Sequence, residues 1–457
     1  MAFTYHPPTR SVCPVCEELE ANKQLPVIRS NGKASHANNF PIHNWYHFVL
    51  GYTPEFPDYI IKRENISEEN TVLDPFMGAG TTLVCCKFKG ISSAGLDANE
   101  YFVDVAKAKL DWGIDTNLIT NEGIKLISEI SKKFKSIDFG TVEAAQLRLI
   151  PKDSTITVGE YNQVNRPSML SNRYISDRPF VKAQIIKKCI EEQIENESVK
   201  RLFNLAIAAT LVPISNIKYG PGFGVTTPKY DADVLGIFRV KIDRIIAELE
   251  NVPHHLKCIF SEAGLGDSRE LSKYYKADTF DYMITSPPYP GDHEYTKHSR
   301  LELIFMGYVN DIASLRKIKE RMLRGSTTNI YRNDRDGDHV AELNSIKKIT
   351  TEIEKRLKED EATSGFEKLY TKLIREYFGG MYRMMSQALQ VLKKNGKFIL
   401  LVSDSHAFKM VHISTASILA EIGQEIGYSD HLMELWQDKI STSHKYNMRE
   451  NILTLVK

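Results

Sequence analysis

Seven short runs of apolar or β-branched residues, each bounded by turn residues, set the strongest limit on how this chain of 457 residues folds. Such runs are typical of β-strands. Because helical patterns or long segments separate most of them, few can pair as simple hairpins. We predict strands at Thr71–Asp74, Ser92–Asp97, Leu256–Phe260, Phe280–Thr285, Gly396–Ser403, His431–Trp436 and Asn451–Val456.

Helical patterns follow several of these strands. Alternation of strand and helix predicts a doubly wound α/β fold with a mostly parallel sheet, whose ligands bind at the carboxyl ends of the strands. About 14 residues without a clear helical pattern separate the last two strands, which predicts a C-terminal antiparallel hairpin at one edge. The predicted helices are Thr81–Lys89, Asn99–Trp112, Ser268–Tyr275 and Lys368–Leu392, the last ending at a Lys-Lys-Asn-Gly helix stop over residues 393–396.

Two long stretches interrupt this alternation and divide the chain. The first spans about 140 residues and contains helical patterns at Val181–Ile194, Val199–Leu211 and Val234–Leu249. The second spans almost 60 residues and is polar and basic. We therefore expect an N-terminal extension over 1–40, a sheet domain over 41–112, 256–310 and 366–457, a helical insertion over 113–255 and a basic insertion over 311–365.

Composition describes an ordinary folded protein, with 42% hydrophobic and 26% charged residues. The 59 Lys and Arg nearly balance the 58 Asp and Glu, so any nucleic-acid surface must be local. The longest strongly apolar stretch, Leu202 to Ile214, is too short for a membrane span, and the N-terminus lacks the apolar run of a signal peptide. We expect a cytoplasmic protein without membrane contact.

Six cysteines are too few for a disulfide framework in a chain of this length. Only Cys13 and Cys16 have metal-like spacing, and His36 and His43 would have to complete a zinc site. A reduced N-terminal turn is the favoured interpretation, and no metal is expected.

The segment Val72-Leu-Asp-Pro-Phe-Met-Gly-Ala-Gly-Thr-Thr82 is the most informative loop. A strand ends at Asp74, and Gly78 and Gly80 let the backbone approach a ligand before a helix begins. The first N–H groups of that helix suit a carboxylate or phosphate, although a Gly-X-Gly pattern alone also fits a tight turn.

Asp97 ends the next predicted strand, 17 residues after Gly80, where a carboxylate can accept hydrogen bonds from both hydroxyls of a ribose. It could also cap the helix that begins near Asn99. No Walker lysine follows the glycines and no third glycine stands near Leu83, which disfavours a nucleotide triphosphatase and a dinucleotide oxidoreductase.

A second segment, Asp281-Tyr-Met-Ile-Thr-Ser-Pro-Pro-Tyr289, leads from a strand into two prolines and an aromatic residue. The prolines fix the backbone and leave carbonyls without sheet partners, so Ser286 and the Pro287 carbonyl can accept hydrogen bonds from an amino group. Tyr289 can stack on a flat ring. Pro-Pro-Tyr is also common in turns, but here it follows a predicted buried strand in a chain that also has the glycine loop.

Both segments resemble motifs of the exocyclic-amino DNA methyltransferases. Residues 74–82 are similar to their cofactor loop, and 285–289 to their catalytic loop, whose usual forms are Asp/Asn/Ser-Pro-Pro-Tyr/Phe. Asp97 fits the acidic ribose ligand of the family, Asp267 the residue that faces the cofactor adenine, and 295–305 the helix after the catalytic loop. His43-Asn-Trp-Tyr46 lies where the family closes over the methionine end of the cofactor. The resemblance covers the sheet domain and neither insertion.

The resemblance implies a Rossmann-like methyltransferase sheet, and the two mostly helical insertions interrupt it. It implies methyl transfer from S-adenosylmethionine to the exocyclic amine of a base flipped out of double-stranded DNA. The implied catalytic residues are Ser286, Pro287, Pro288 and Tyr289. The implied cofactor-binding residues are Asp74, Phe76, Gly78, Gly80, Thr81, Thr82, Asp97, Asp267 and Trp45.

Ser rather than Asp before Pro-Pro-Tyr resembles the cytosine-N4 members more than the adenine-N6 ones, and we expect N4 of cytosine. N6-adenine methylation, RNA as substrate, and a catalytically silent DNA-binding module of the same fold stay as alternatives. Residues 313–358 hold twelve Lys or Arg against seven Asp or Glu, a pattern that suits DNA contact or a solvated helix face. The DNA-contact candidates are Arg321, Arg324, Arg332 and Lys218, and a restriction or anti-phage protein is a possible partner.

Overall fold

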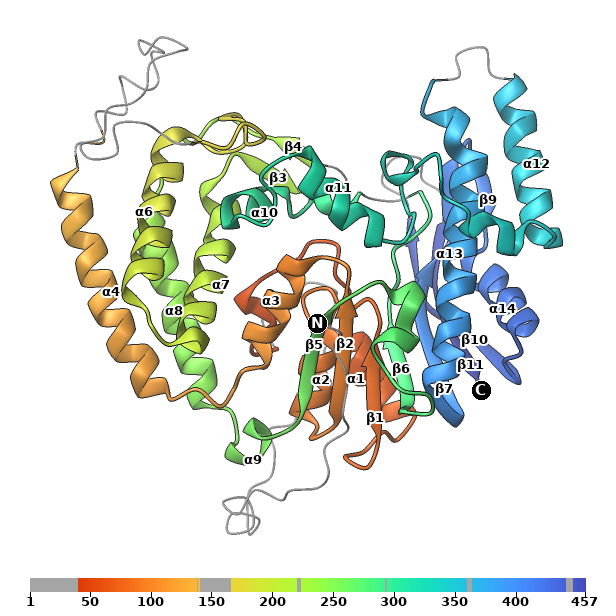
Figure 1. The fold of residues 1–457 in the computed structure, drawn as a ribbon, viewed down its shortest axis with the longest axis horizontal. Coiled ribbons are helices and arrows are strands. Elements are labelled where there is room, and N and C mark those ends of the chain that lie inside the picture. Colours follow the sequence, from red (N-terminus) through yellow and green to blue (C-terminus); the bar gives the residue numbers. More distant parts are fainter. Residues whose placement is uncertain are drawn as a thin grey trace.

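The computed structural model describes residues 40–137, 139, 166–219, 223–291, 294–359, 364–440 and 447–457. Its centre is a seven-stranded sheet of order β10-β11-β7-β6-β1-β2-β5 (Figure 1). Strands β5, β2, β1, β6 and β7 are parallel, and β11 is antiparallel to both β7 and β10. This topology confirms the predicted α/β sheet and its C-terminal antiparallel pair. The strands are β1 (Thr71–Asp74), β2 (Ser92–Asp97), β5 (Ser261–Leu265), β6 (Phe280–Thr285), β7 (Leu392–Ser403), β10 (Asp430–Ile440) and β11 (Asn447–Val456).

Apolar residues occupy both faces of the central strands, so neighbouring residues pack into different cores. Val72 and Ile399 pack against α1 (Glu55–Arg63) and α2 (Thr81–Phe88). Leu73 and Leu400 belong to the opposite core, which is closed by α13 (Tyr370–Val391) and α14 (Thr415–Ile426). Helices on both faces leave the carboxyl ends of the strands as the accessible edge.

The first insertion is helical and packs beside the sheet, where its helices share one hydrophobic core with α3 (Glu100–Leu110). Figure 1 shows these helices side by side next to the β5 edge of the sheet. Among them, α4 was not predicted from the sequence. They are α4 (Thr116–Ser136), α6 (Asp177–Gln193), α7 (Glu197–Ile214) and α8 (Val234–Glu250); β3 (Ile217–Tyr219) and β4 (Phe223–Val225) form a small hairpin.

The second insertion is anchored to α13. A Cβ at Gly379 of α13 would lie 1.9 Å from the Asp336 carbonyl oxygen, so only glycine permits this approach. Asp336 also accepts a 2.8 Å hydrogen bond from Arg269, which joins the insertion to the sheet domain. The insertion contains α11 (Ile312–Arg321), the 3₁₀ turns η5 (Thr327–Asn329) and η6 (Asp336–Val340), and α12 (Asn344–Glu359).

The remaining elements are short. They are η2 (His43–Trp45), α9 (His254–Lys257), η3 (Ser268–Lys273), η4 (Tyr295–Lys297), α10 (Arg300–Met306), η7 (Glu367–Leu369), β8 (Ser405–Phe408) and β9 (Val411–Ile413). Among the residues described, none of the helices combines the length and apolar character needed to cross a bilayer.

Two element predictions were wrong. The strand predicted at 256–260 is displaced, because α9 occupies residues 254–257 and β5 begins at Ser261. The helix predicted over 368–392 is confirmed, since α13 spans Tyr370–Val391; residues 393–396 that follow it lie in β7, with a shifted register opposite β6. The helix predicted at 268–275 is the kinked 3₁₀ turn η3. Cys13, Cys16, His36 and the rest of residues 1–39 lie outside the described residues.

Candidate active site

The Asp74 carboxylate ties together the loops that follow β1 and β6. Its Oδ1 accepts hydrogen bonds from the Thr285 hydroxyl at 2.6 Å and the Phe76 amide at 3.1 Å. Its Oδ2 accepts a 2.5 Å hydrogen bond from Tyr52, whose hydroxyl also contacts Thr82 at 2.5 Å. Burial raises the pKa of Asp74, and these donors oppose that shift. Asp74 therefore sets the relative position of the two loops from beneath.

The glycine loop between β1 and α2 turns through left-handed backbone. Gly78 and Gly80 have φ angles of +49° and +84°, which favour glycine over any residue with a side chain. A Cβ at Gly80 would lie 3.1 Å from the Ala106 Cβ of α3, so this turn also needs the space. No side chain caps α2 at Gly80, so the first N–H groups of this helix have no partner within the helix or from its N-cap.

Asp97, at the end of β2, holds this loop in place. Its Oδ2 accepts a 3.0 Å hydrogen bond from the Gly78 amide, and its Oδ1 accepts a 2.8 Å bond from the Asn99 amide. Burial raises the pKa of Asp97 to about 6. Asn99 itself is the N-cap of α3 and accepts a hydrogen bond from the Tyr101 amide. The capping role considered for Asp97 therefore belongs to Asn99.

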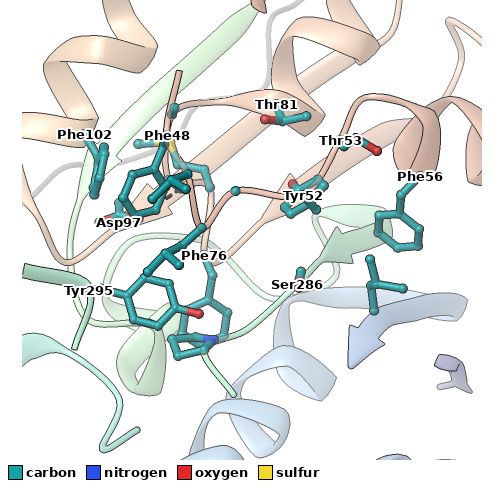
Figure 2. Close-up of a pocket in the computed structure, with 18 of the residues that line it drawn as sticks. Phe48, Tyr52, Thr53, Phe56, Phe76, Thr81, Asp97, Phe102, Ser286 and Tyr295 are labelled. Atoms are coloured by element: carbon teal, nitrogen blue, oxygen red, sulfur yellow. Dashed lines mark hydrogen bonds between the residues drawn. The ribbon is translucent and has the colours of Figure 1, made fainter. Parts of the chain in front are cut away.

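A cavity of about 390 Å³ joins the two loops. Figure 2 shows Asp97 and Phe102 at one end of it and Ser286 and Phe56 at the other. This volume is in the range of small-molecule sites. The sequence-predicted residues that line it are Phe76, Gly78, Thr81, Asp97, Ser286, Pro288, Tyr289 and Arg321.

Other predicted cofactor residues lie away from the cavity surface. Asp74, Gly80 and Thr82 are buried beneath the loop. The indole N–H of Trp45 donates a 2.8 Å hydrogen bond to Glu248 of α8, which directs it toward the first insertion. The Asp267 carboxylate pairs with Arg269 at 2.6 Å, while its neighbour Ser268 does line the cavity.

The loop after β6 places its polar groups toward the sheet. Ser286 Oγ lies 3.1 Å from the Tyr289 hydroxyl, and that hydroxyl donates to Glu450 of β11 at 3.1 Å. Glu450 and Gln437 of β10 also line the cavity, and sequence reasoning missed both. No local motif could have found them, because they join the site only through the pairing of β10, β11 and β7.

The residues predicted to contact DNA divide into two pairs. Arg321 lines the cavity and donates a 3.1 Å hydrogen bond to the Ala98 carbonyl. Arg324 is buried and binds both carboxylate oxygens of Asp334 at 3.0 Å, besides three backbone carbonyls. Arg332 and Lys218 are exposed.

The comparisons with known proteins agree with this geometry. A family model described as "DNA methylase" matches residues 19–108. The Type II methyltransferase M.AvaI of Nostoc sp. is 24% identical over 415 residues, covering 85% of this chain and 79% of the relative. M.BsoBI of Geobacillus stearothermophilus is 24% identical over 69% of this chain and 61% of the relative, and M.MvaI of Kocuria varians 26% over 58% of each. No solved structure matched the chain significantly.

The sheet order and the position of the cavity at its carboxyl edge define the class as a Rossmann-like methyltransferase fold. Within that class, the family model and the Type II methyltransferase relatives support the exocyclic-amino (N4/N6) DNA methyltransferase family.

Proposed function

We propose that this protein transfers a methyl group from S-adenosylmethionine to the exocyclic amine of a flipped DNA base, and that the base is cytosine, methylated at N4. The observation that carries the proposal is one continuous cavity with the Asp97 and glycine-loop end on one side and the Ser286 end on the other. A methyl donor and a methyl acceptor must meet in such a space.

The Asp97 end fits a nucleoside cofactor. Gly78 and Thr81 present a glycine turn and a helix start, while the Asp97 carboxylate can accept from ribose hydroxyls. Phe76 and Ser268 provide the walls beside it. When bound there, S-adenosylmethionine supplies an electrophilic methyl on its sulfonium. Asp74, Gly80 and Thr82 would support this end of the cavity from below. Trp45 and Asp267 would contribute to cofactor binding indirectly, through neighbouring residues.

The Ser286 end would orient the target amine. An exocyclic amine is a poor nucleophile because its lone pair is delocalised into the ring. The Ser286 hydroxyl and the Pro287 carbonyl would accept its two N–H groups and favour a pyramidal nitrogen whose lone pair faces the methyl. Pro288 fixes the backbone of this loop, and the Tyr289 ring would stack on the flipped base.

Cytosine-N4 is proposed because the residue before Pro-Pro-Tyr is a neutral serine, which resembles the cytosine-specific members. Adenine-N6 is the second candidate, since a neutral hydroxyl can serve either amine. Two further alternatives keep the same fold: an enzyme that acts on RNA, and a DNA-binding module without catalysis. Neither would methylate DNA. The intact Asp97 and Ser286 ends of one cavity favour the enzyme.

For DNA contact, we propose that the insertions over 113–255 and 311–365 carry the surface that reads the target. Lys218 and Arg332 keep exposed side chains suited to phosphate contact. The bounds of the sheet domain, 41–112, 256–310 and 366–457, are part of this proposal. Because the named relatives are Type II methyltransferases, a restriction or anti-phage partner and a place in the cytoplasm are also proposed.

Transfer of tritiated methyl groups to unmethylated mixed-sequence DNA tests the proposal. We expect incorporation by the wild-type protein. Pro287→Ala and Tyr289→Ala should abolish most turnover while affinity for S-adenosylhomocysteine changes little, whereas Asp97→Ala should weaken that affinity. Absence of both incorporation and calorimetric binding of S-adenosylhomocysteine would rule out the enzyme, and the opposite pattern among variants would mean that the two ends of the cavity are exchanged.

A further inference from the structure

A chain of hydrogen bonds runs from Ser286 into the sheet. Ser286 Oγ lies 3.1 Å from the Tyr289 hydroxyl, which donates to Oε1 of Glu450 at 3.1 Å. The other carboxylate oxygen of Glu450 accepts from the side-chain amide of Gln437. Glu450 and Gln437 face each other across β11 and β10. Both oxygens of this carboxylate thus have a donor.

The Glu450 carboxylate fixes the direction of donation along this series of hydrogen bonds. Both oxygens of Glu450 accept a hydrogen bond, so the single proton of Tyr289 points to this carboxylate. The Leu401 carbonyl is a longer and neutral alternative at 3.4 Å. Burial and the nearby carboxylate hold the pKa of Tyr289 well above its usual range, so the phenol keeps its proton. The Tyr289 oxygen can then receive the proton of Ser286.

This direction decides what Ser286 presents to the cavity. A hydroxyl that donates toward Tyr289 leaves its lone pairs for an incoming amine, whereas a hydroxyl that donates into the cavity would oppose the amine N–H. An aspartate at this position would be an acceptor without help. A serine needs its proton drawn elsewhere.

We propose that Glu450 is a positioning residue that, through Tyr289, keeps Ser286 an acceptor for the target amine. This inference rests on the proposed function. It also accounts for a carboxylate only 6% exposed on an interior strand, where an apolar residue would be less costly for folding.

Glu450→Gln should reverse the direction of donation along these hydrogen bonds. The Gln437 amide already occupies one side of residue 450, so a glutamine there would turn its oxygen to Gln437 and its NH₂ to Tyr289. Tyr289 would then donate to Ser286, whose proton would face the cavity. Adding Gln437→Glu restores an acceptor beside the new amide, lets its oxygen face Tyr289 and returns the original direction. Tyr289→Phe removes the relay altogether.

The test measures single-turnover methyl transfer to unmethylated DNA, the affinity for S-adenosylhomocysteine by calorimetry, and the melting temperature. We expect Glu450→Gln to slow transfer by about 10- to 100-fold, the scale of one charge-assisted hydrogen bond, with affinity and melting temperature nearly unchanged. The Gln437→Glu/Glu450→Gln variant should recover most of the rate. Tyr289→Phe should be slow as well, and adding Glu450→Gln to it should slow it no further.

Wild-type speed in Glu450→Gln, or equal slowness with and without Gln437→Glu, would overturn the inference. If Glu450→Gln does not fold, Tyr289→Phe decides, and a wild-type rate in that variant would overturn it too. A wild-type protein that binds S-adenosylhomocysteine but methylates no DNA would instead refute the proposed function, which is a separate result.

Discussion

The Thr285 hydroxyl donates a 2.6 Å hydrogen bond to the Asp74 carboxylate between two adjacent strands of the sheet. Asp74 precedes the glycine loop and Thr285 precedes Ser286, so one buried contact sets the spacing of the two ends of the cavity. The same carboxylate is braced by Tyr52 from the segment before α1.

Thr285→Val keeps the shape of this residue but removes the donor. Because the contact is to a buried carboxylate, we expect a loss of about 1–3 kcal/mol in the free energy of unfolding. Turnover should fall more than affinity for S-adenosylhomocysteine, since the two loops lose their common anchor. Denaturant unfolding and calorimetry check both, with Thr120→Val as a control because its hydroxyl bonds only within α4. Equal turnover in the two variants would contradict this role of Asp74.

The raised pKa of Asp97 predicts that cofactor affinity depends on pH. Its pKa of about 6 in the unbound protein means that it is ionised at pH 7.5 and largely protonated at pH 5.5. Since ribose hydroxyls would bind the ionised form, affinity should be lost as pH falls through 6, by about fourfold at pH 5.5. The effect on folding has the opposite sign. Because the pKa of Asp97 is raised in the folded protein, its contribution to stability is lost as pH rises from the pKa of the unfolded chain to about 6.

Calorimetry with S-adenosylhomocysteine at the two pH values tests this expectation. Asp97→Asn should bind weakly at both, with little change between them. A wild-type affinity independent of pH in this window would argue against a direct contact of Asp97 with the ligand.

Gly80→Ala should damage the cofactor loop. The residue has φ of +84°, and its new Cβ would stand 3.1 Å from Ala106. Left-handed backbone costs a residue with a side chain about 1–2 kcal/mol, and the contact adds strain. We expect lower stability and about tenfold weaker binding of S-adenosylhomocysteine. Gly113→Ala, with open space around its Cβ position, is the matched control, and equal affinities for the two variants would count against the loop.

Substitutions of Arg321 and Arg332 should affect different ligands, the cofactor and DNA respectively. Arg321 lies in the cavity, and its charge is one of the factors that lower the pKa of Asp97 against the effect of burial. Arg321→Gln should therefore weaken binding of S-adenosylhomocysteine and move the pH midpoint of that binding upward.

Arg332→Gln should leave cofactor binding unchanged and weaken DNA binding on all sequences, with a shallower salt dependence. Fluorescence anisotropy on DNA at several salt concentrations, beside calorimetry with S-adenosylhomocysteine, measures both effects. Reversed effects of the two arginines would place DNA, not cofactor, at Arg321.

The sequence was sufficient to predict the interior of the sheet. The bounds of β1, β2 and β6 agree with the predicted runs, because buried parallel strands are short, apolar and bounded by turns. The strand β5 was misplaced because it lies at the sheet edge and reads Ser-Glu-Ala-Gly-Leu, with little apolar signal. The nearby apolar residues at 256–260 drew the prediction away.

The candidate site was likewise predictable only in part. Its two loops were predictable because each is contiguous in sequence and carries its chemistry locally. Tyr52, Glu450 and the inward position of Arg321 were not, since each depends on contacts between residues far apart in the chain, such as Tyr289 and Glu450. Arg324 is a predicted DNA contact because it flanks a basic, polar segment, whereas in the structure its guanidinium pairs with Asp334.

Mass spectrometry of nucleosides from DNA incubated with the protein and S-adenosylmethionine identifies the methylated atom. We expect N4-methylcytosine, absent from a parallel reaction with Pro287→Ala. N6-methyladenine as the product would contradict the assignment of the base while keeping the chemistry. Methylation at carbon 5 of cytosine, or no methylated nucleoside from a protein that binds S-adenosylhomocysteine, would contradict transfer to an exocyclic amine at the Ser286 end of the cavity.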